Sequence, residues 1–85
     1  MNSIDGDALT LVKCRMARAA LSVSIDRAAE LSKVSQASIT RFELGGDIRP
    51  VLRAALRGFF EQSGVVFTPR GVEVQLDHSQ SGMAA

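Results

Sequence analysis

The sequence predicts a mainly α-helical domain with a helix-turn-helix motif and a small β-hairpin near its C-terminal end. Three observations support this prediction. Apolar residues recur at helical spacing from residue 10 to residue 63, a Ser or Thr precedes three of the expected helices, and segments in which apolar and polar residues alternate follow Gly64. The chain has 85 residues, of which 46% are hydrophobic and 22% charged, as is usual for one folded domain. We expect four to five short helices.

The chain divides into four segments. Residues 1–9 are short and polar and predict a flexible N-terminal arm, residues 10–64 hold the helices, residues 65–76 form the hairpin, and residues 77–85 predict a disordered tail. The segments are too short for a second domain. We therefore seek the function within residues 10–76.

The first helix is expected to begin after Thr10, whose hydroxyl can cap it. Residues three, four or seven positions apart then share one face: Leu11, Cys14, Ala17, Arg18 and Leu21. A charged side chain on an apolar face needs a partner or a route to solvent. Arg18 is therefore a residue whose contacts the fold must explain.

Two short helices follow. Ser24 is a candidate cap for the first of them, with Asp26 placed favourably in its first turn. Ser35 is a candidate cap for the second, which Gly45 and Gly46 would end. Both helices have fewer than ten residues, and the turn between them is only three to four residues long.

A fourth helix is expected to begin at Pro50 and to end at Gly64. Its predicted apolar stripe consists of Leu52, Ala55, Leu56 and Phe59, and a charged stripe on its other side consists of Arg49, Arg53, Arg57 and Glu61. The segments VVFTP and GVEVQL then alternate around the turn Thr-Pro-Arg-Gly, which predicts a hairpin.

The charge of the chain is unevenly distributed. Residues 13–57 hold nine Lys or Arg against four acidic residues, which gives +5, and the flanks hold one Arg against five acidic residues, which gives −4. A basic segment of this kind suits a surface that binds a polyanion, although an ordinary solvated surface can have the same composition.

Several classes of protein are disfavoured. Cys14 is the only cysteine, which excludes an intramolecular disulfide and a multi-cysteine zinc site. The one histidine, His78, stands far along the chain from it, and no third group is placed to orient either one, so we expect neither an enzyme nor a cofactor or metal. The sequence has neither a membrane-spanning run nor a signal peptide, so we expect a cytoplasmic protein.

The spacing of the two central helices predicts a helix-turn-helix motif. Two helices that cross steeply need a small residue on the first, and Ala29 supplies one. Val34 and Ile39 would be buried between them. The outward face of the second helix then has no part in the core: Ser35, Gln36, Ala37, Ser38, Thr40 and Arg41.

The segment SIDRAAELSKVSQASITRFELGG resembles the DNA-binding domain of the Cro/C1-type (XRE) family of regulators, and the flanking segments CRMARAALSVS and LRGFFEQSGVVFTPRGVEVQL extend this resemblance over about residues 10–76. It implies a lambda-repressor-like fold. Two positions depart from the pattern. Lys33 stands where the family most often has Gly, and Ile25 stands where a polar residue such as Gln is frequent. A left-handed backbone conformation at Lys33 would cost about 1 kcal/mol. A looser turn or a different end of the preceding helix is therefore an alternative.

The resemblance implies that the second helix of the motif enters the major groove of DNA. The implied base contacts are Gln36, Ala37, Ser38, Thr40 and Arg41, and the implied phosphate contacts are Ser24, Lys33, Ser35 and Arg49, with Arg27 and Arg53 as further candidates. The alternative is that these side chains are only the solvated face of a short helix. The resemblance also implies a structural salt bridge between Arg18 and Glu43. The alternative for Arg18 is that its side chain reaches solvent instead.

Such proteins generally bind paired half-sites as homodimers. The apolar residues near the C-terminal end exceed what four short helices need, so we expect a dimer interface formed by Phe60, Val65, Val66, Phe67, Val72 and Val74. The alternative is that this segment completes the core of its own chain.

The function expected from these features is that of a sequence-specific transcriptional regulator, a repressor or Cro-like switch of a phage or other mobile element. It would bind a double-stranded operator, associate with the bacterial nucleoid, and contact RNA polymerase if it also activates. The alternative is a protein-interaction module of the same fold, such as an antitoxin or anti-activator, without specific DNA binding.

Overall fold

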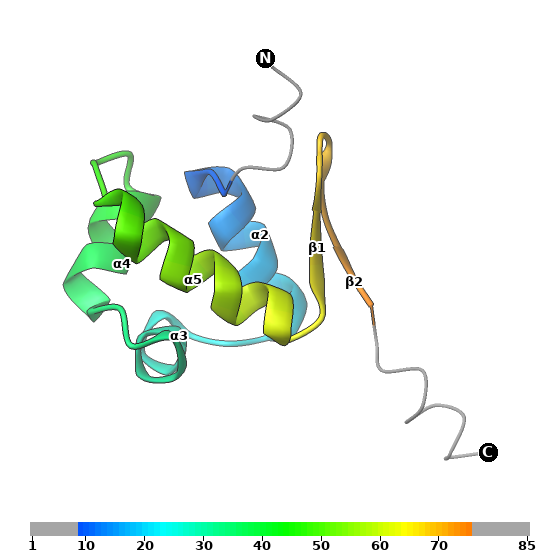
Figure 1. The fold of residues 1–85 in the computed structure, drawn as a ribbon, viewed down its shortest axis with the longest axis horizontal. Helices are drawn as coiled ribbons and strands as arrows, with labels where there is room; N and C mark the ends of the chain where they lie inside the picture. The colour runs from blue at the N-terminus through cyan, green and yellow to red at the C-terminus, as the bar shows by residue number, and fades with distance from the viewer. Residues whose placement is uncertain (1–8, 76–85) are drawn as a thin grey trace.

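The computed structural model describes residues 9–75. This part of the chain is mainly helical and ends in a two-stranded antiparallel sheet, which confirms the predicted fold class (Figure 1). The elements are α2 (Leu11–Leu21), α3 (Ile25–Ser32), α4 (Gln36–Glu43), α5 (Pro50–Gln62), β1 (Val65–Thr68) and β2 (Gly71–Val74). The predicted arm and tail lie outside the described residues, except for Leu9, which is buried in the core.

Three helices begin at the caps that the sequence predicts. The hydroxyls of Thr10, Ser24 and Ser35 each accept a hydrogen bond from the backbone N–H three residues further on, at 3.2, 3.0 and 3.1 Å. Each hydroxyl satisfies an N–H that has no partner within the helix. Pro50 occupies the first turn of α5, also as predicted.

The turns that follow α2 and α3 are short because each helix ends in a left-handed residue. Ser22 has a φ of 58° and Lys33 a φ of 67°. Lys33 therefore adopts the conformation that usually belongs to glycine, and the alternative of a looser turn is wrong. Only Lys33, Val34 and Ser35 separate α3 from α4. The two helices pack directly against each other as a helix-turn-helix unit.

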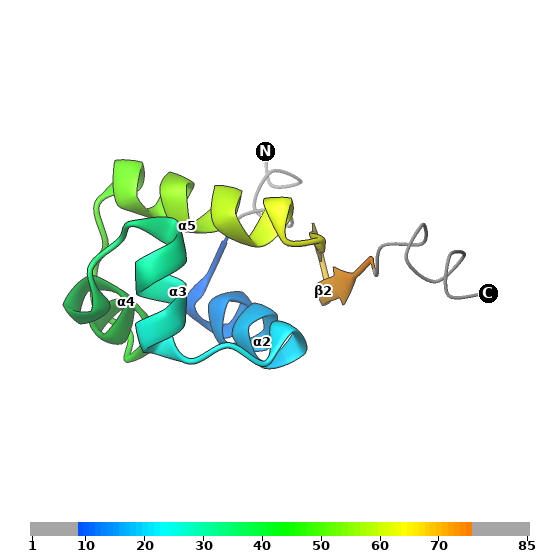
Figure 2. The same ribbon diagram turned by 90° about the horizontal axis from the view of Figure 1, so that it is seen from below.

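The core lies between α5 on one side and α2, α3 and α4 on the other (Figure 2). Its largest fully buried side chains are Leu9, Cys14, Val34, Ile39, Leu56 and Phe60. Val34 and Ile39 are buried as the motif requires. The small buried residue of α3 is Ala28 and not Ala29, which is only partly buried, because the core-facing side of α3 lies one position earlier than predicted.

The apolar stripe of α5 also differs from the prediction. Leu56 and Phe60 are buried, Leu52 and Phe59 are partly buried, and Ala55 is exposed. Phe60 contacts Phe67 of β1 edge to face, with ring centroids 6.3 Å apart. This contact connects the end of α5 to the hairpin.

The hairpin has the predicted turn, and its register pairs Val65 with Val74 and Thr68 with Gly71. The predicted dimer interface is partly wrong, because Phe60 of α5 and Val65 and Phe67 of β1 belong to the core of their own chain. In a strand, alternate side chains face opposite sides, so Val65 and Phe67 turn inward together while Val66 between them is exposed. Val72 and Val74 are partly buried against the same core.

Candidate nucleic-acid interface

Helix α4 has two faces of different character. Ile39, Phe42 and Glu43 are buried against the rest of the chain. The predicted base contacts lie on the other faces: Gln36, Ala37 and Arg41 are exposed, and Ser38 and Thr40 are partly exposed. No segment within residues 9–75 covers them. The structure thus leaves accessible the side chains that sequence analysis selected.

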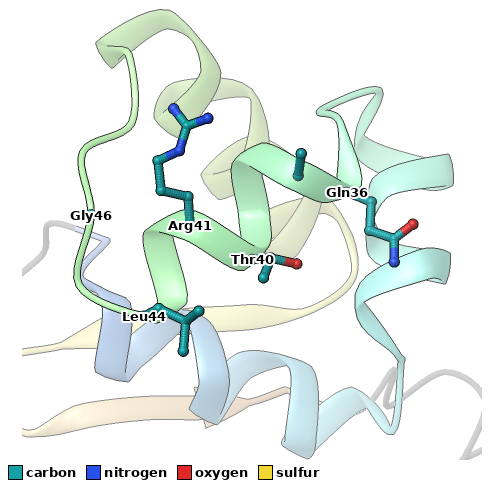
Figure 3. A pocket seen from close by; sticks show the side chains of 6 residues that line it. Gln36, Thr40, Arg41, Leu44 and Gly46 are labelled. Atoms are coloured by element: carbon teal, nitrogen blue, oxygen red, sulfur yellow. The ribbon is translucent and has the colours of Figure 1, made fainter.

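A groove runs along the exposed face of α4 (Figure 3). This α4 groove has a volume of about 700 Å³ and is lined by Gln36, Ala37, Thr40, Arg41, Leu44 and Gly46. Four of these six residues are predicted base contacts. In Figure 3 the side chains of Gln36, Thr40 and Leu44 point to one side of α4, and that of Arg41 points to the other. Leu44 and Gly46 were not among the predicted contacts, although Leu44 follows Ala37 by seven positions, a spacing that helical periodicity places on the same face.

Gly46 is placed directly against Arg41. Its backbone N–H donates a hydrogen bond of 2.8 Å to the Arg41 carbonyl oxygen. A Cβ atom at position 46 would lie 2.5 Å from Cγ of Arg41, which is closer than side chains tolerate. The absence of a side chain at Gly46 therefore leaves room for the Arg41 side chain in its observed conformation.

A second groove adjoins the first on the Arg41 side. It has a volume of about 410 Å³ and is lined by Ser38, Arg41, Asp47, Ile48, Arg49 and Leu52. Arg41 thus lines both grooves, and Arg49 joins it at the second. The fold brings a predicted phosphate contact next to a predicted base contact, while the carboxylate of Asp47 reduces the positive charge between them.

The remaining candidate phosphate contacts differ in their availability. The Ser24 and Ser35 hydroxyls cap helices, and Ser35 also donates to Ser38 Oγ at 2.9 Å. Arg27 forms an exposed ion pair with Glu30 at 2.9 Å, which lowers its net attraction for a phosphate. Lys33 and Arg53 are exposed. The structure does not gather Arg27 into either groove.

Glu43, at the end of α4, accepts hydrogen bonds from Arg18 of α2 and from Cys14. The distances are 2.7 Å and 2.8 Å to Arg18 and 3.1 Å to the Cys14 sulfur. This is the ion pair that the resemblance implied, and the thiol contact is an addition that sequence analysis missed. Arg18 also donates to the Val23 carbonyl oxygen at 3.2 Å. The network fixes α4 to α2 and to the turn before α3.

Burial and hydrogen bonding shift the pKa values within this network. Burial raises the pKa of Glu43, but hydrogen bonds from Arg18 and Cys14 counteract it, so the pKa lies below its ordinary value. The hydrogen bond to Glu43 raises the pKa of Arg18, and burial followed by the hydrogen bond to Glu43 raises that of Cys14. The pair is therefore charged and the thiol protonated at neutral pH. Such a thiol is a poor nucleophile.

Lys13 is buried, which its position in the basic segment did not indicate. Its ammonium group donates to the Thr68 carbonyl oxygen at the turn of the hairpin. A residue that appeared to belong to the basic surface thus connects α2 to β1. Arg57 is likewise engaged, with Glu61 at 2.9 Å and over the ring of Phe67 at 5.2 Å. Neither belongs to the face that α4 exposes.

No protein-family model, curated protein or solved structure matches the chain. Within residues 9–75, no three His, Cys, Asp or Glu side chains are grouped as metal ligands would be. Over the same range, the helices are too short or too polar to cross a bilayer. The candidate site therefore depends on the geometry of α4 and its neighbours.

Proposed function

We propose that the protein is a sequence-specific DNA-binding transcriptional regulator of the Cro/C1 type, which places α4 in the major groove. The observation that carries the proposal is the division of α4 into a buried face and an exposed face. Ile39 and Phe42 hold the helix in the core, and Gln36, Ala37 and Arg41 remain exposed on the outside. A helix presented in this way has the dimensions of the major groove and can contact base edges.

The chemistry of the exposed residues suits base edges. Gln36 can donate to and accept from adenine, Arg41 can donate two hydrogen bonds to guanine, and Ala37 can touch a thymine methyl group. Ser38 and Thr40 carry hydroxyls suited to bases or phosphates. Ser38 Oγ accepts a hydrogen bond from the Ser35 hydroxyl, which leaves its own O–H able to donate to a ligand. These roles follow from side-chain type and from position on α4.

Phosphate contacts would come from the flanking cations and the helix N-termini. Arg49 lines the second groove beside Arg41, and Lys33 is exposed in the turn before α4. Lys33 precedes the N-terminal end of α4 and Arg49 follows its C-terminal end, so the two cations flank the helix where the backbone of bound DNA would pass. Ser24, Ser35, Arg27 and Arg53 are the other candidates, of which Arg27 is the weakest because Glu30 pairs with it.

The decisive experiment is selection of duplexes from a random library by the full chain, followed by anisotropy titrations of the selected duplex and of an unrelated duplex at several salt concentrations. We expect one recurring motif and affinity that falls steeply with salt. Arg41→Ala should weaken binding tenfold to a hundredfold, or about 1–3 kcal/mol, and relax the preference at one base pair. Arg49→Ala should weaken binding to both duplexes and reduce the salt dependence.

Arg70→Ala is the matched control, because Arg70 is an exposed arginine in the hairpin turn, away from both grooves. It should leave the binding curve unchanged. If selection yields no motif, or if all three arginine variants lose affinity equally, α4 does not contact bases and the proposal is wrong.

The proposed regulator binds paired half-sites about one helical turn apart as a homodimer. The hairpin supports this part of the proposal because both of its strands are edges of a two-stranded sheet and Val66 is exposed on it. Of the residues first expected at the interface, only Val66, Val72 and Val74 can still contribute. The hairpin and α4 lie at opposite ends of the molecule in both views, so pairing there leaves α4 uncovered (Figures 1 and 2).

Val66→Lys tests this surface, because a lysine on an edge strand opposes pairing. Light scattering should show a dimer for the natural chain and a monomer for the variant, with the same helical content by circular dichroism. Truncation after Gly64 would be a poor test, since it removes Val65 and Phe67 from the core. A dimer that persists in Val66→Lys would place the interface elsewhere.

As a regulator the protein would act from the bacterial nucleoid, as a repressor or switch of a mobile element, and would contact RNA polymerase only where its operator lies beside a promoter. The competing function is a protein-interaction module, such as an antitoxin or anti-activator. The selection experiment separates the two, because a module of that kind gives no recurring DNA motif.

A further inference from the structure

The α4 groove has an apolar wall that the hydrogen-bonding residues leave unexplained. Leu44 is 81% exposed, more than any other large hydrophobic side chain within residues 9–75. Its backbone N–H closes α4 by donating to the carbonyl oxygens of Thr40 and Arg41, and its side chain takes no part in the core. A polar residue could end the helix equally well. The apolar side chain is therefore a feature of the groove and not of the fold.

Two smaller residues, Ala37 and Thr40, precede Leu44 in this groove. Ala37, Thr40 and Leu44 are spaced by three and four positions, so they succeed one another along one face of α4. In Figure 3 the Thr40 and Leu44 side chains lie on the same side of the helix. The methyl group of Thr40 and the isobutyl group of Leu44 thus form a short apolar strip, with the amide of Gln36 on the same side of α4 and the guanidinium of Arg41 on the other.

We propose that this strip binds the 5-methyl group of a thymine in the operator half-site, with Leu44 as the residue that determines the preference. The proposal rests on the proposed function. The thymine methyl is the one apolar group that the standard base pairs present in the major groove. A strip bounded by hydrogen-bonding side chains fits a surface on which one methyl group is surrounded by donors and acceptors.

The size and charge of the surroundings favour DNA over a protein partner. A stable protein interface buries about 800 Å² on each side, with an apolar centre built from several large side chains. The α4 groove offers only one large apolar residue, and Arg41 connects it to a second groove that also contains Arg49. Cationic groups beside a small apolar contact suit a polyanion that carries methyl groups.

The first part of the test alters the DNA and uses the natural protein. In the duplex selected by the full chain, each thymine is replaced in turn by uracil, which lacks only the methyl group. For the natural protein, we expect uracil at one position of each half-site to weaken binding about fourfold, which corresponds to about 0.8 kcal/mol for one buried methyl group. Uracil at other positions should have a smaller effect.

Leu44→Ala should show a matching loss on the thymine duplex and no further loss on the uracil duplex. Because the Leu44 side chain is so exposed, the melting temperature of the Leu44→Ala variant should equal that of the natural chain. Val12→Ala is the control, since Val12 is 57% exposed but lies on α2 outside both grooves. It should retain the full sensitivity to uracil.

The outcomes separate this inference from the proposed function. If no motif is selected at all, the proposed function fails. If a motif is selected but no uracil position weakens binding, or if Leu44→Ala remains as sensitive to uracil as the natural chain, the methyl site at Leu44 is wrong while the DNA-binding function stands. In the latter case, Ala37 or Thr40 contacts the thymine methyl group and Leu44 does not.

Discussion

The Glu43 carboxylate accepts hydrogen bonds from Arg18 through both of its oxygens, at 2.8 Å from Nε to Oε2 and 2.7 Å from Nη2 to Oε1. The carboxylate is 6% exposed and the arginine 21%. The pair joins the end of α4 to α2, so the helix that carries the candidate contacts is held at its C-terminal end by a charge pair and at its N-terminal end by the Ser35 cap.

Glu43→Ala should destabilise the fold by about 2–4 kcal/mol. The loss leaves the Arg18 guanidinium partly buried without its partner, which is costlier than breaking a surface pair but less costly than exposing a fully buried charge. Urea unfolding followed by circular dichroism measures the change. Glu61→Ala removes the exposed pair with Arg57 and should change stability by less than about 1 kcal/mol. Equal effects of the two variants on the free energy of unfolding would show that the Arg18–Glu43 pair stabilises the fold no more than an exposed ion pair does.

The same pair predicts how stability depends on pH. Because the pKa of Glu43 is lowered in the folded state, its contribution is fully present above the ordinary pKa of 4.5 and is lost as the pH falls through the lowered value. Glu43→Gln cannot be protonated in this range, so the stability advantage of the natural chain over the variant should shrink below about pH 4.5. Urea titrations at pH 3 to 7 measure this difference. A constant difference across the range would contradict the pKa shift.

The features that the sequence predicted well are those set by local chemistry. Thr10, Ser24 and Ser35 cap helices because a hydroxyl at that position satisfies an unpaired N–H whatever the tertiary packing. The hairpin turn was predictable for the same reason, since Pro and Gly restrict or permit particular backbone angles. The exposed face of α4 followed from helical spacing, because Phe42 and Glu43 lie three and four positions after Ile39 and share its buried side.

The features that the sequence did not predict depend on which of two equivalent faces meets the core. Ala28 and Ala29 have the same side chain, and only the rotation of α3 decides that Ala28 is buried. In the same way, the apolar composition of 65–67 did not reveal that strand geometry turns Val65 and Phe67 inward. A different reason applies to Lys13, because its partner, the Thr68 carbonyl oxygen, is a backbone atom 55 positions away.

Lys33→Gly should raise the stability of the fold and weaken DNA binding. Lys33 has a φ of 67°, a conformation that costs a side-chain-bearing residue about 1 kcal/mol and glycine little. For a domain of this size, the gain corresponds to a melting temperature higher by about 4–8 °C. Removal of the cation should also reduce the salt dependence of binding if Lys33 contacts a phosphate.

Arg53→Gly is the control for the backbone effect, since it introduces glycine into the right-handed interior of α5. It should lower stability by about 1 kcal/mol. A Lys33→Gly variant that melts at or below the temperature of the natural chain would show that the turn gains nothing from glycine there.

Gly46→Ala should disturb DNA binding through Arg41 while leaving the fold in place. An alanine Cβ would lie 2.5 Å from Cγ of Arg41 and 3.1 Å from its carbonyl oxygen, so the stem of the arginine must move. We expect a loss of affinity close to that of Arg41→Ala, about tenfold or more, and little further loss when both substitutions are combined. Anisotropy titrations with the selected duplex measure the three variants.

Gly58→Ala is the matched control, because a Cβ at that position would meet no atom within 4 Å apart from its chain neighbours and the backbone of its own helix. Alanine in the interior of α5 should raise stability by about 0.5–1 kcal/mol without changing affinity. If Gly46→Ala binds as the natural chain does, or if its effect adds fully to that of Arg41→Ala, the contact between residues 41 and 46 does not position the arginine for DNA.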